Sequence, residues 1–178
     1  MVATFLQDDL AEELKEIFKD FRLKNPMGEL SEINVFLQEL PIPAPTTPPE
    51  ESEVAPELLE EGLAEDTDPV KVEDPYPYAI VRIEDGEIKT IDGEQTVTVM
   101  VILGVFDDNL NNQGHKDILN MIQKIYERFA KNAILARKYE CLHPIQWSLQ
   151  EEGSYPYFIG GMALTFSVAA IRREDPLI

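Results

Sequence analysis

Two spacings of hydrophobic residues divide the chain into expected helices and strands. Near the N-terminus apolar residues recur every three or four positions, as on one face of a helix: Leu10, Leu14, Ile17, Phe18 and Phe21. Asp8 or Asp9 is placed to cap the first turn, and Asn25-Pro26 to stop the helix. The pattern therefore predicts an amphipathic helix whose apolar stripe must be buried.

Alternation of apolar and polar residues predicts strands beyond this helix. Residues 33–40 alternate well enough to form a strand that Pro41 ends, and residues 78–83 predict a second short strand. Dipeptides typical of tight turns follow it: Asp85-Gly86 and Asp92-Gly93. These stretches predict neighbouring strands joined by short turns.

Residues 96–106 predict a long strand that is apolar on both faces. One face carries Val97, Val99, Val101, Leu103 and Val105, and the other carries Met100, Ile102 and Phe106. A strand of this kind is usually central in its sheet. We expect helices to cover one of its sides and a different layer to cover the second.

The C-terminal half predicts a second helix and two more strands. Residues 114–135 form the helix, with an apolar stripe made of Ile118, Ile122, Ile125, Tyr126, Phe129 and Ala133. Ile145, Trp147 and Leu149 alternate with polar residues in the next strand, and residues 157–171 supply the last. The fold class is therefore α+β, with a mixed, mainly antiparallel sheet and two main helices packed on one face.

An acidic, proline-rich segment interrupts this pattern. Between residues 46 and 75 there are eleven acidic residues and one lysine, preceded by the sequence PIPAPTTPP. Such a segment repels itself and reads as an extended arm, in which residues 54–65 could form one or two helical turns. Four parts are expected: 1–40, a helix and strand of the core; 41–75, the arm; 76–173, the α+β core; and 174–178, a C-terminal tail.

The net charge narrows the classes of partner. At −19 the chain should repel nucleic acid and anionic membrane, which disfavours DNA binding through phosphate contacts. An acidic wall beside passing DNA is compatible with that charge. The N-terminus has no secretory pattern, and no stretch has the ~18 apolar residues that a membrane helix needs. We expect a soluble protein made in a cytoplasm.

Residues 107–111 resemble the start of a calcium-binding loop. Asp107, Asn109 and Asn111 stand at alternate positions, but the motif also needs a glycine at its sixth position and a glutamate at its twelfth. The chain has Asn112 and Ile118 there. The simpler interpretation is a turn that caps the following helix.

The other reactive side chains also favour structural roles. Cys141 is the only cysteine, so no internal disulfide can form, and Cys141 with His143 gives two metal ligands without partners. His115 has no nucleophile in a recognisable setting beside it. We predict no metal, no cofactor and no catalytic residue among them.

The stretch WSLQEEGSYPYFIGG contains two further patterns that suggest chemistry. Glu151 and Glu152 are adjacent, and neighbours on a strand point to opposite faces, so the pair cannot flank one bond. Gly160-Gly161 matches no phosphate-binding motif, and a bulge or a close backbone approach explains it better. We therefore expect a protein that is not an enzyme.

Four short patterns resemble the tail terminator, or tail-completion, proteins of long-tailed bacteriophages and prophages. They are DPYPYAIVRIEDGE, TVTVMVILGVFDDN, GHKDILNMIQKIYERF and HPIQWSLQEEGSYPYFIGGMALTF. The family pattern is a Pro-Tyr start, an apolar strand ending in an acidic turn, a Gly-Asp helix, a Trp strand and a Pro-Tyr/Phe-Gly strand. Its places are taken here by residues 75–78, 106–108, 114–117, Trp147 and 155–160. The resemblance covers residues 74–173 and leaves out the N-terminal helix and the arm.

The resemblance implies a structural role in the virion. Proteins of this family form a hexameric ring on the head-proximal end of the tail tube, stop addition of tube subunits and present a surface to the head connector. DNA passes through the ring without specific binding. The resemblance thus implies the tube protein and a connector or neck protein as partners. The composition of the arm, which cannot bury enough apolar surface to fold alone, predicts separately that it lies along a neighbouring subunit or the tube.

The aromatic and acidic residues at one hairpin end are the expected contact residues: Trp147, Tyr155, Tyr157, Phe158, Asp107 and Asp108. We expect Trp147, Tyr155 and Tyr157 to cluster, with rings buried against the core or against an adjoining subunit. Two alternatives stay open. One is a different phage neck or head-tail joining protein, and the other is a small dimeric α+β regulatory domain.

Overall fold

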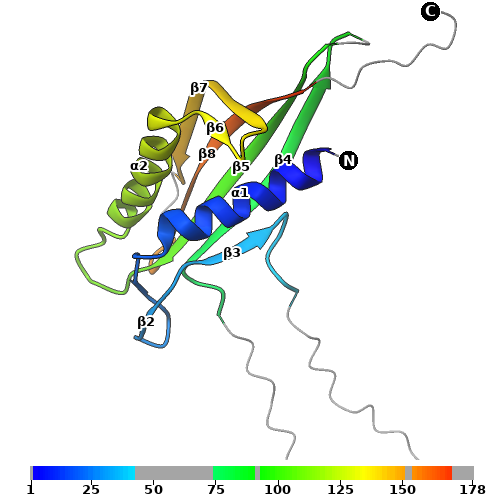
Figure 1. Cartoon of the computed structure of the whole chain (residues 1–178). Coiled ribbons are helices and arrows are strands. Elements are labelled where there is room, and N and C mark those ends of the chain that lie inside the picture. Colours follow the sequence, from blue (N-terminus) through cyan, green and yellow to red (C-terminus); the bar gives the residue numbers. More distant parts are fainter. Residues whose placement is uncertain (1, 43–73, 91–92, 151–153, 170–178) are drawn as a thin grey trace, which may run out of the picture.

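The structure is a computed structural model that describes residues 2–42, 74–90, 93–150 and 154–169. Most of the arm, Glu151, Glu152 and the tail at 174–178 lie outside these ranges, as do the helical turns predicted at 54–65. The described residues form two helices and one main sheet (Figure 1). This arrangement confirms the predicted α+β class.

Six strands build the main sheet in the order β3-β4-β5-β8-β7-β6. Their bounds are Asn34–Leu37 for β3, Tyr78–Ile88 for β4, Gln95–Phe106 for β5, Ile134–Leu135 for β6, Tyr139–Leu149 for β7 and Tyr157–Val168 for β8. Only the β3–β4 pair is parallel among these strands. A small hairpin, β1 (Leu23–Lys24) with β2 (Leu30–Ser31), forms a separate two-stranded sheet, and its first strand contacts β5.

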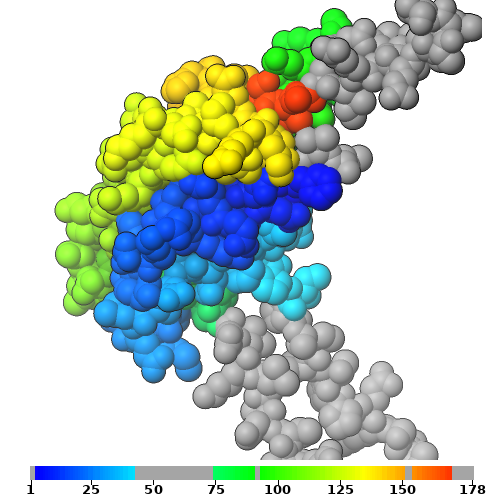
Figure 2. All heavy atoms as spheres, in the orientation of Figure 1, coloured from blue at the N-terminus to red at the C-terminus, as the bar shows by residue number. Residues whose placement is uncertain are grey.

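Two helices cover one face of the sheet. Helix α1 (Val2–Phe18) packs on β3 and β4, and α2 (His115–Lys131) packs on β8, β5 and β7. Figure 2 shows them side by side, α1 in blue and α2 in yellow-green. The two helices therefore share one hydrophobic core with the sheet.

The core follows from strand alternation. Every second residue of β5 points to the helices and is buried: Val97, Val99, Val101, Leu103 and Val105. On β8 the matching residues are Met162, Leu164, Phe166 and Val168, and α1 adds Leu6, Leu10 and Leu14. Phe129 of α2 packs edge-on to Phe166, with ring centroids 5.6 Å apart. Burial of these side chains is the main stabilising term of the fold.

The second face of the sheet carries no helix in the described part of the chain. Met100, Ile102 and Phe106 of β5 point to this face and are only partly buried. The second covering layer predicted for the central strand is therefore not present among the described residues. This face is called the uncovered face below.

The ends of α1 differ from the prediction. The helix begins at Val2 and not at Asp8 or Asp9, and it ends at Phe18, well before Asn25-Pro26. The first turns of α1 are stabilised by tertiary contacts: Leu6 is fully buried, and the Gln7 side chain donates to the Val81 carbonyl over 2.7 Å. Residues after Phe18 leave the helix to form the β1–β2 hairpin.

Asp85-Gly86 is not a turn, contrary to the prediction. Both residues lie within β4, beside an irregularity between Ile83 and Asp85, and the Gly86 amide donates to Asp85 Oδ1 over 2.7 Å. The chain reverses later, where the Gly93 amide donates to the Thr90 carbonyl over 3.0 Å. A bulge uses the same residue types as a turn.

The second helix also ends earlier than predicted. It stops at Lys131 because Asn132 is extended, and Ile134–Leu135 pair with β7 as strand β6. Tyr126, predicted in the apolar stripe, is 44% exposed, whereas Met121 is fully buried. The buried stripe is therefore rotated around the helix, away from Tyr126 and toward Met121, relative to the predicted one.

Three strands have different bounds from those predicted. Strand β3 is shorter than residues 33–40 because Gln38 has a positive φ of 66° and leaves the ladder. Strand β4 runs past residue 83, and β7 begins at Tyr139, before the alternating Ile145, Trp147 and Leu149. Tertiary pairing extends both of these strands beyond the local pattern.

Arg128 joins the two helices and the end of α2. Its guanidinium forms a half-buried ion pair with Glu13 of α1 and donates to the carbonyls of Asn132 and Ile134 over 2.5 and 3.2 Å. The same side chain lies 5.2 Å from the Phe129 ring centroid. Arg128 thus holds the segment that leads from α2 into β6 while it pairs with α1.

Replacing Arg128 by alanine should lower the free energy of unfolding by about 2 kcal/mol, because Glu13 and two carbonyls lose a charged donor. Lys124→Ala is the control: its contact with Glu127 is exposed and 4.0 Å long, so its loss should cost at most about 0.5 kcal/mol. Urea unfolding followed by circular dichroism measures both. Equal losses would show that Arg128 does not join the helices.

Candidate interaction surfaces

An aromatic cluster occupies one end of the uncovered face. Tyr76 packs against both Tyr78 and Tyr157 with ring centroids 4.8 Å apart, and Tyr157 packs against Phe106 at 5.5 Å. Tyr157 and Phe106 are direct partners across β5 and β8, which explains their contact. Burial and the neighbouring Tyr78 raise the pKa of the Tyr76 phenol.

Three members of this cluster were not among the predicted contact residues: Tyr76, Tyr78 and Phe106. All three occupy even-numbered positions in or just before β4 and β5, so the sequence places them on one face of these strands. Their contact, however, depends on the register between the strands. Gly104 gives Tyr78 its place, since a Cβ there would lie 2.4 Å from the Tyr78 ring. The cluster is therefore a product of the sheet and not of one segment.

Asp107, Asp108 and Tyr155 form a rim beside this cluster. The Asp107 amide donates to the Pro156 carbonyl over 2.9 Å, and the Tyr155 hydroxyl donates to the Asp108 carbonyl over 2.8 Å. Lys24 Nζ lies 2.6 Å from Asp108 Oδ1, and this contact holds the pKa of Asp108 below its usual range. The rim thus ties the β1–β2 hairpin to the ends of β5 and β8.

The side chain of Asp107 serves the local turn. Asp107 Oδ1 accepts from the backbone amide of Asn109 over 3.1 Å and from its side-chain amide over 2.5 Å. Burial, and secondly the nearby Asp107, raise the pKa of Asp117. Within the described residues, no group of three His, Cys, Asp or Glu side chains is arranged to hold a metal ion.

Phe158 lies on the side of the sheet opposite to the aromatic cluster. It packs against the core beneath the start of α2, where a Cβ on Gly114 would lie 2.4 Å from its ring. Gly114 is the residue that precedes α2 and caps it. Phe158 therefore packs beneath the start of α2. The sequence pattern did not show whether Phe158 is such a packing residue or a surface contact residue.

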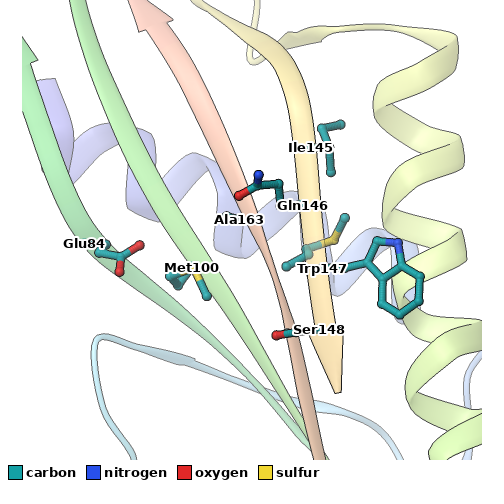
Figure 3. A pocket seen from close by; sticks show the side chains of 9 residues that line it. Glu84, Met100, Ile145, Gln146, Trp147, Ser148 and Ala163 are labelled. Carbon is teal, nitrogen blue, oxygen red and sulfur yellow. The ribbon is translucent and has the colours of Figure 1, made fainter. Parts of the chain in front are cut away.

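Trp147 does not join the tyrosines, contrary to the prediction. It pairs with Met162 on β8, so it shares the helix-covered side of the sheet, whereas Tyr157 lies on the uncovered face. Figure 3 shows the indole directed toward α2. Its side chain is 57% exposed, which leaves a large aromatic surface in contact with solvent.

Beside Trp147 the sheet has an open edge. The short strand β6 pairs only with Tyr139 and Glu140, so the described chain places no strand against the outer side of β7 from Leu142 onward. Residues 142–150 carry no Asp, Glu, Lys or Arg. An uncharged open edge is a template for pairing with another chain.

The opposite edge of the sheet is protected. Beyond the β3 pairing, the Gln38 side chain accepts from the Ile83 amide over 3.1 Å and donates to its carbonyl over 3.2 Å. The rest of this edge is exposed and acidic, with Glu84, Asp85 and Glu87. Charges, prolines and bulges are the usual means of blocking strand addition. Strand β7 has its own irregularity between Leu142 and Gln146, with Pro144 within it, so the regular and uncharged part of its edge is residues 146–149.

The uncovered face is hollowed beside β7. The hollow has a volume of about 580 Å³ and is lined by Glu84, Met100, Ile145, Gln146, Trp147, Ser148, Gly161, Met162 and Ala163 (Figure 3). Glu84 is its one ionisable lining residue. The lining supplies contact area and hydrogen-bonding groups, and it does not bring two acid–base groups together.

The glycine pair 160-161 serves strand packing. A Cβ on Gly161 would lie 2.8 Å from the Val101 carbonyl oxygen, and one on Gly160 would lie 2.7 Å from the Ile118 side chain. The predicted close backbone approach is therefore confirmed.

Cys141 and the two histidines differ in burial. Cys141 is buried, and burial raises the pKa of its thiol to about 11. His143 is exposed beyond it on β7, and His115 is half-buried at the start of α2. Cys141 therefore behaves as a small core residue.

Comparison with known proteins adds no relative. No protein-family model matches the chain, and no curated protein sequence matches it significantly. Neither described helix is long and apolar enough to cross a membrane.

The Cys141 thiol should react only when the fold opens. At pH 8 a thiol with a pKa near 11 is almost wholly protonated, and the thiolate is the reactive form. We expect labelling by an aromatic disulfide reagent to be slow in buffer and fast in urea. Fast labelling of the folded protein would contradict the buried position.

Proposed function

We propose that this protein is a tail terminator of a long-tailed phage or prophage. In this proposal it forms a ring on the head-proximal end of the tail tube, stops tube growth and offers the surface to which the head joins. It acts by steric capping and needs neither turnover nor a bound cofactor. Its place is the neck-proximal end of the virion tail.

One observation carries the proposal. Segments 75–78, 106–108, 114–117 and 155–160, which carry the resemblance to terminators, meet at one end of the sheet. They meet through the aromatic cluster, the Asp107–Pro156 hydrogen bond and the contact of Phe158 with Gly114. Four places of a pattern spread along the chain thus come together at one end of the sheet, on its two faces, while the fifth place, Trp147, lies apart from them.

The charge and the exposed faces support the same proposal. A net charge of −19 suits a ring wall that DNA must pass without adhering. The uncovered face and the open edge of β7 leave apolar and backbone groups that an assembled neighbour would cover. Both features serve assembly better than they serve binding of a small substrate.

Capping should be stoichiometric. When the protein is titrated into polymerising tube protein, substoichiometric amounts should leave a proportionate share of tubes overlong, because each ring blocks one end. Electron microscopy measures the length distribution. Full length control by a trace amount would refute steric capping and indicate a catalyst.

The glutamate pair provides a matched control for that titration. Glu151→Gln with Glu152→Gln should leave capping unchanged, because the proposal assigns the pair no chemistry. Loss of capping in this variant alone would argue for a carboxylate mechanism. A stable dimer as the sole assembled form would instead favour the regulatory-domain alternative.

Tyr155 should matter more for assembly than for folding. It is 46% exposed and makes one hydrogen bond, to the Asp108 carbonyl. Tyr155→Ala should weaken ring assembly, measured by sedimentation, more than it lowers the unfolding midpoint. Tyr155→Phe keeps the ring and removes the hydroxyl, so it separates loss of contact area from loss of the hydrogen bond. Equal loss of assembly and stability would place Tyr155 in the fold alone.

A further inference from the structure

An uncharged surface lies where α2 meets the open edge of β7. On β7 it comprises the regular end of the strand, Gln146 to Leu149, including the exposed Trp147. On α2 it comprises a second stripe at helical spacing: Leu119, Gln123, Tyr126 and Ala130. We call it the α2–β7 surface.

The position of α1 decides which flank of α2 stays free. Arg128 pairs with Glu13, so α1 lies against the flank of α2 that carries Arg128. At about 100° per residue, Leu119 and Tyr126 fall on the opposite flank. Tyr126 is 44% exposed there, and Trp147 is 57% exposed on the neighbouring strand.

The segment around this surface is basic, whereas the chain is acidic. Residues 115–150 contain six Lys or Arg and three Asp or Glu, of which Arg128 and Lys138 pair with Glu13 and Asp9 of α1. At about 100° per residue the exposed Lys116 is the lysine of α2 that borders the uncharged stripe. A ligand that fits would combine apolar side chains for the stripe with an acidic group for Lys116.

The chain contains one segment of that composition. Residues 43–73 hold ten acidic residues and one lysine, and their three leucines lie near the middle of the segment: Leu58, Leu59 and Leu63. Docking would bury these side chains against aromatic surface and set a glutamate opposite Lys116. The same composition cannot build a core of its own.

The ends of the segment place it at the other side of the molecule. Ile42 follows β3 and Asp74 precedes β4, whereas β7 lies on the far side of β5 and β8. A head-to-tail ring puts one side of each copy against a different side of the next, and β3 and β7 lie toward opposite sides of the sheet. At ~3.3 Å per residue a segment of this length that leaves and returns reaches roughly 50 Å, enough to extend over a neighbouring domain.

We propose that residues 43–73 of one copy dock on the α2–β7 surface of the next copy. The docked segment joins adjacent subunits and covers Trp147 and the open strand edge. The inference rests on the proposed function only in that copies assemble head to tail. It names the part of the neighbour that each subunit contacts.

Trp147 is the only tryptophan of the chain, so its fluorescence reports on this surface directly. The full-length protein is measured over a dilution series, with assembly followed in parallel by sedimentation. As copies assemble, emission should shift to shorter wavelength and quenching by acrylamide should fall. Both changes should disappear when Leu58, Leu59 and Leu63 are replaced by serine.

A matched control separates this effect from general loss of apolar surface. Leu110 is 95% exposed and lies in the loop before α2, so Leu110→Ser should leave the fluorescence change intact. Tyr126→Ser should abolish the change without touching the segment. Circular dichroism of each variant checks that the fold is retained.

Every other outcome overturns the proposal. If Trp147 stays exposed in the assembled protein, the surface is not an interface. If it becomes covered equally well in the triple serine variant, another part of the neighbour docks there. If it is covered at dilutions where only monomer sediments, the segment binds its own copy.

The experiment does not depend on tail tubes. If the fluorescence change follows assembly but tubes are not capped, the docking stands and the terminator function fails. If tubes are capped while Trp147 stays exposed, the function stands and the docking fails.

Discussion

The register between β5 and β8 is the constraint on which the rest of the molecule depends. These strands are paired over their whole length, and the pairing of Val101 with Met162 sets both side chains toward the helices. The same register sets Phe106 beside Tyr157 on the uncovered face. A slip of one residue would exchange the two faces and expose the core. Gly161 also opposes a change of register, because a residue with a side chain at this position would clash with the carbonyl of Val101. The core and the aromatic cluster are thus consequences of one pairing.

With the faces fixed, the edges of the sheet decide what can still be added to it. The β4 edge is satisfied by the Gln38 side chain and then guarded by carboxylates, whereas the β7 edge has neither. Proteins that keep an edge from pairing place charges on it, and a strand left without them is suited to a partner. Arg128 contributes indirectly, because it fixes α1 on one flank of α2 and leaves the other flank open. The α2–β7 surface therefore stays free because Arg128 holds α1 on the other flank of α2 and the edge carboxylates lie on β4.

Periodicity in the sequence predicted the fold class and the buried face of β5. Both depend on the local alternation of apolar and polar residues, which the tertiary structure does not change. Element ends were harder to predict. The residues near Val2 do not predict the start of a helix. The first turns are stabilised instead by Gln7, whose side chain donates to the carbonyl of Val81 on β4, a residue distant in sequence. Asp85-Gly86 has the composition of a turn and forms a bulge, because β5 continues past it and supplies partners. Of the contact residues, Asp107, Asp108, Tyr155 and Tyr157 do lie at one end of the sheet, while Trp147 and Phe158 lie on its other side. Proximity in sequence predicted a cluster that strand parity divides.

That division has a physical consequence for assembly. The aromatic cluster and Trp147 lie on opposite faces of one sheet, so a single flat partner cannot cover both. In the proposed ring a subunit would have two kinds of neighbour: adjacent copies at its sides, and the tube and the connector at its ends. The rim stands at an end of the strands, where Lys24 and Tyr155 hold Asp108 in a fixed loop. Trp147 stands at a side, next to the open edge of β7. In the proposed assembly a fixed loop suits docking to a preformed tube, whereas an open edge suits pairing with an extended segment of an adjacent copy.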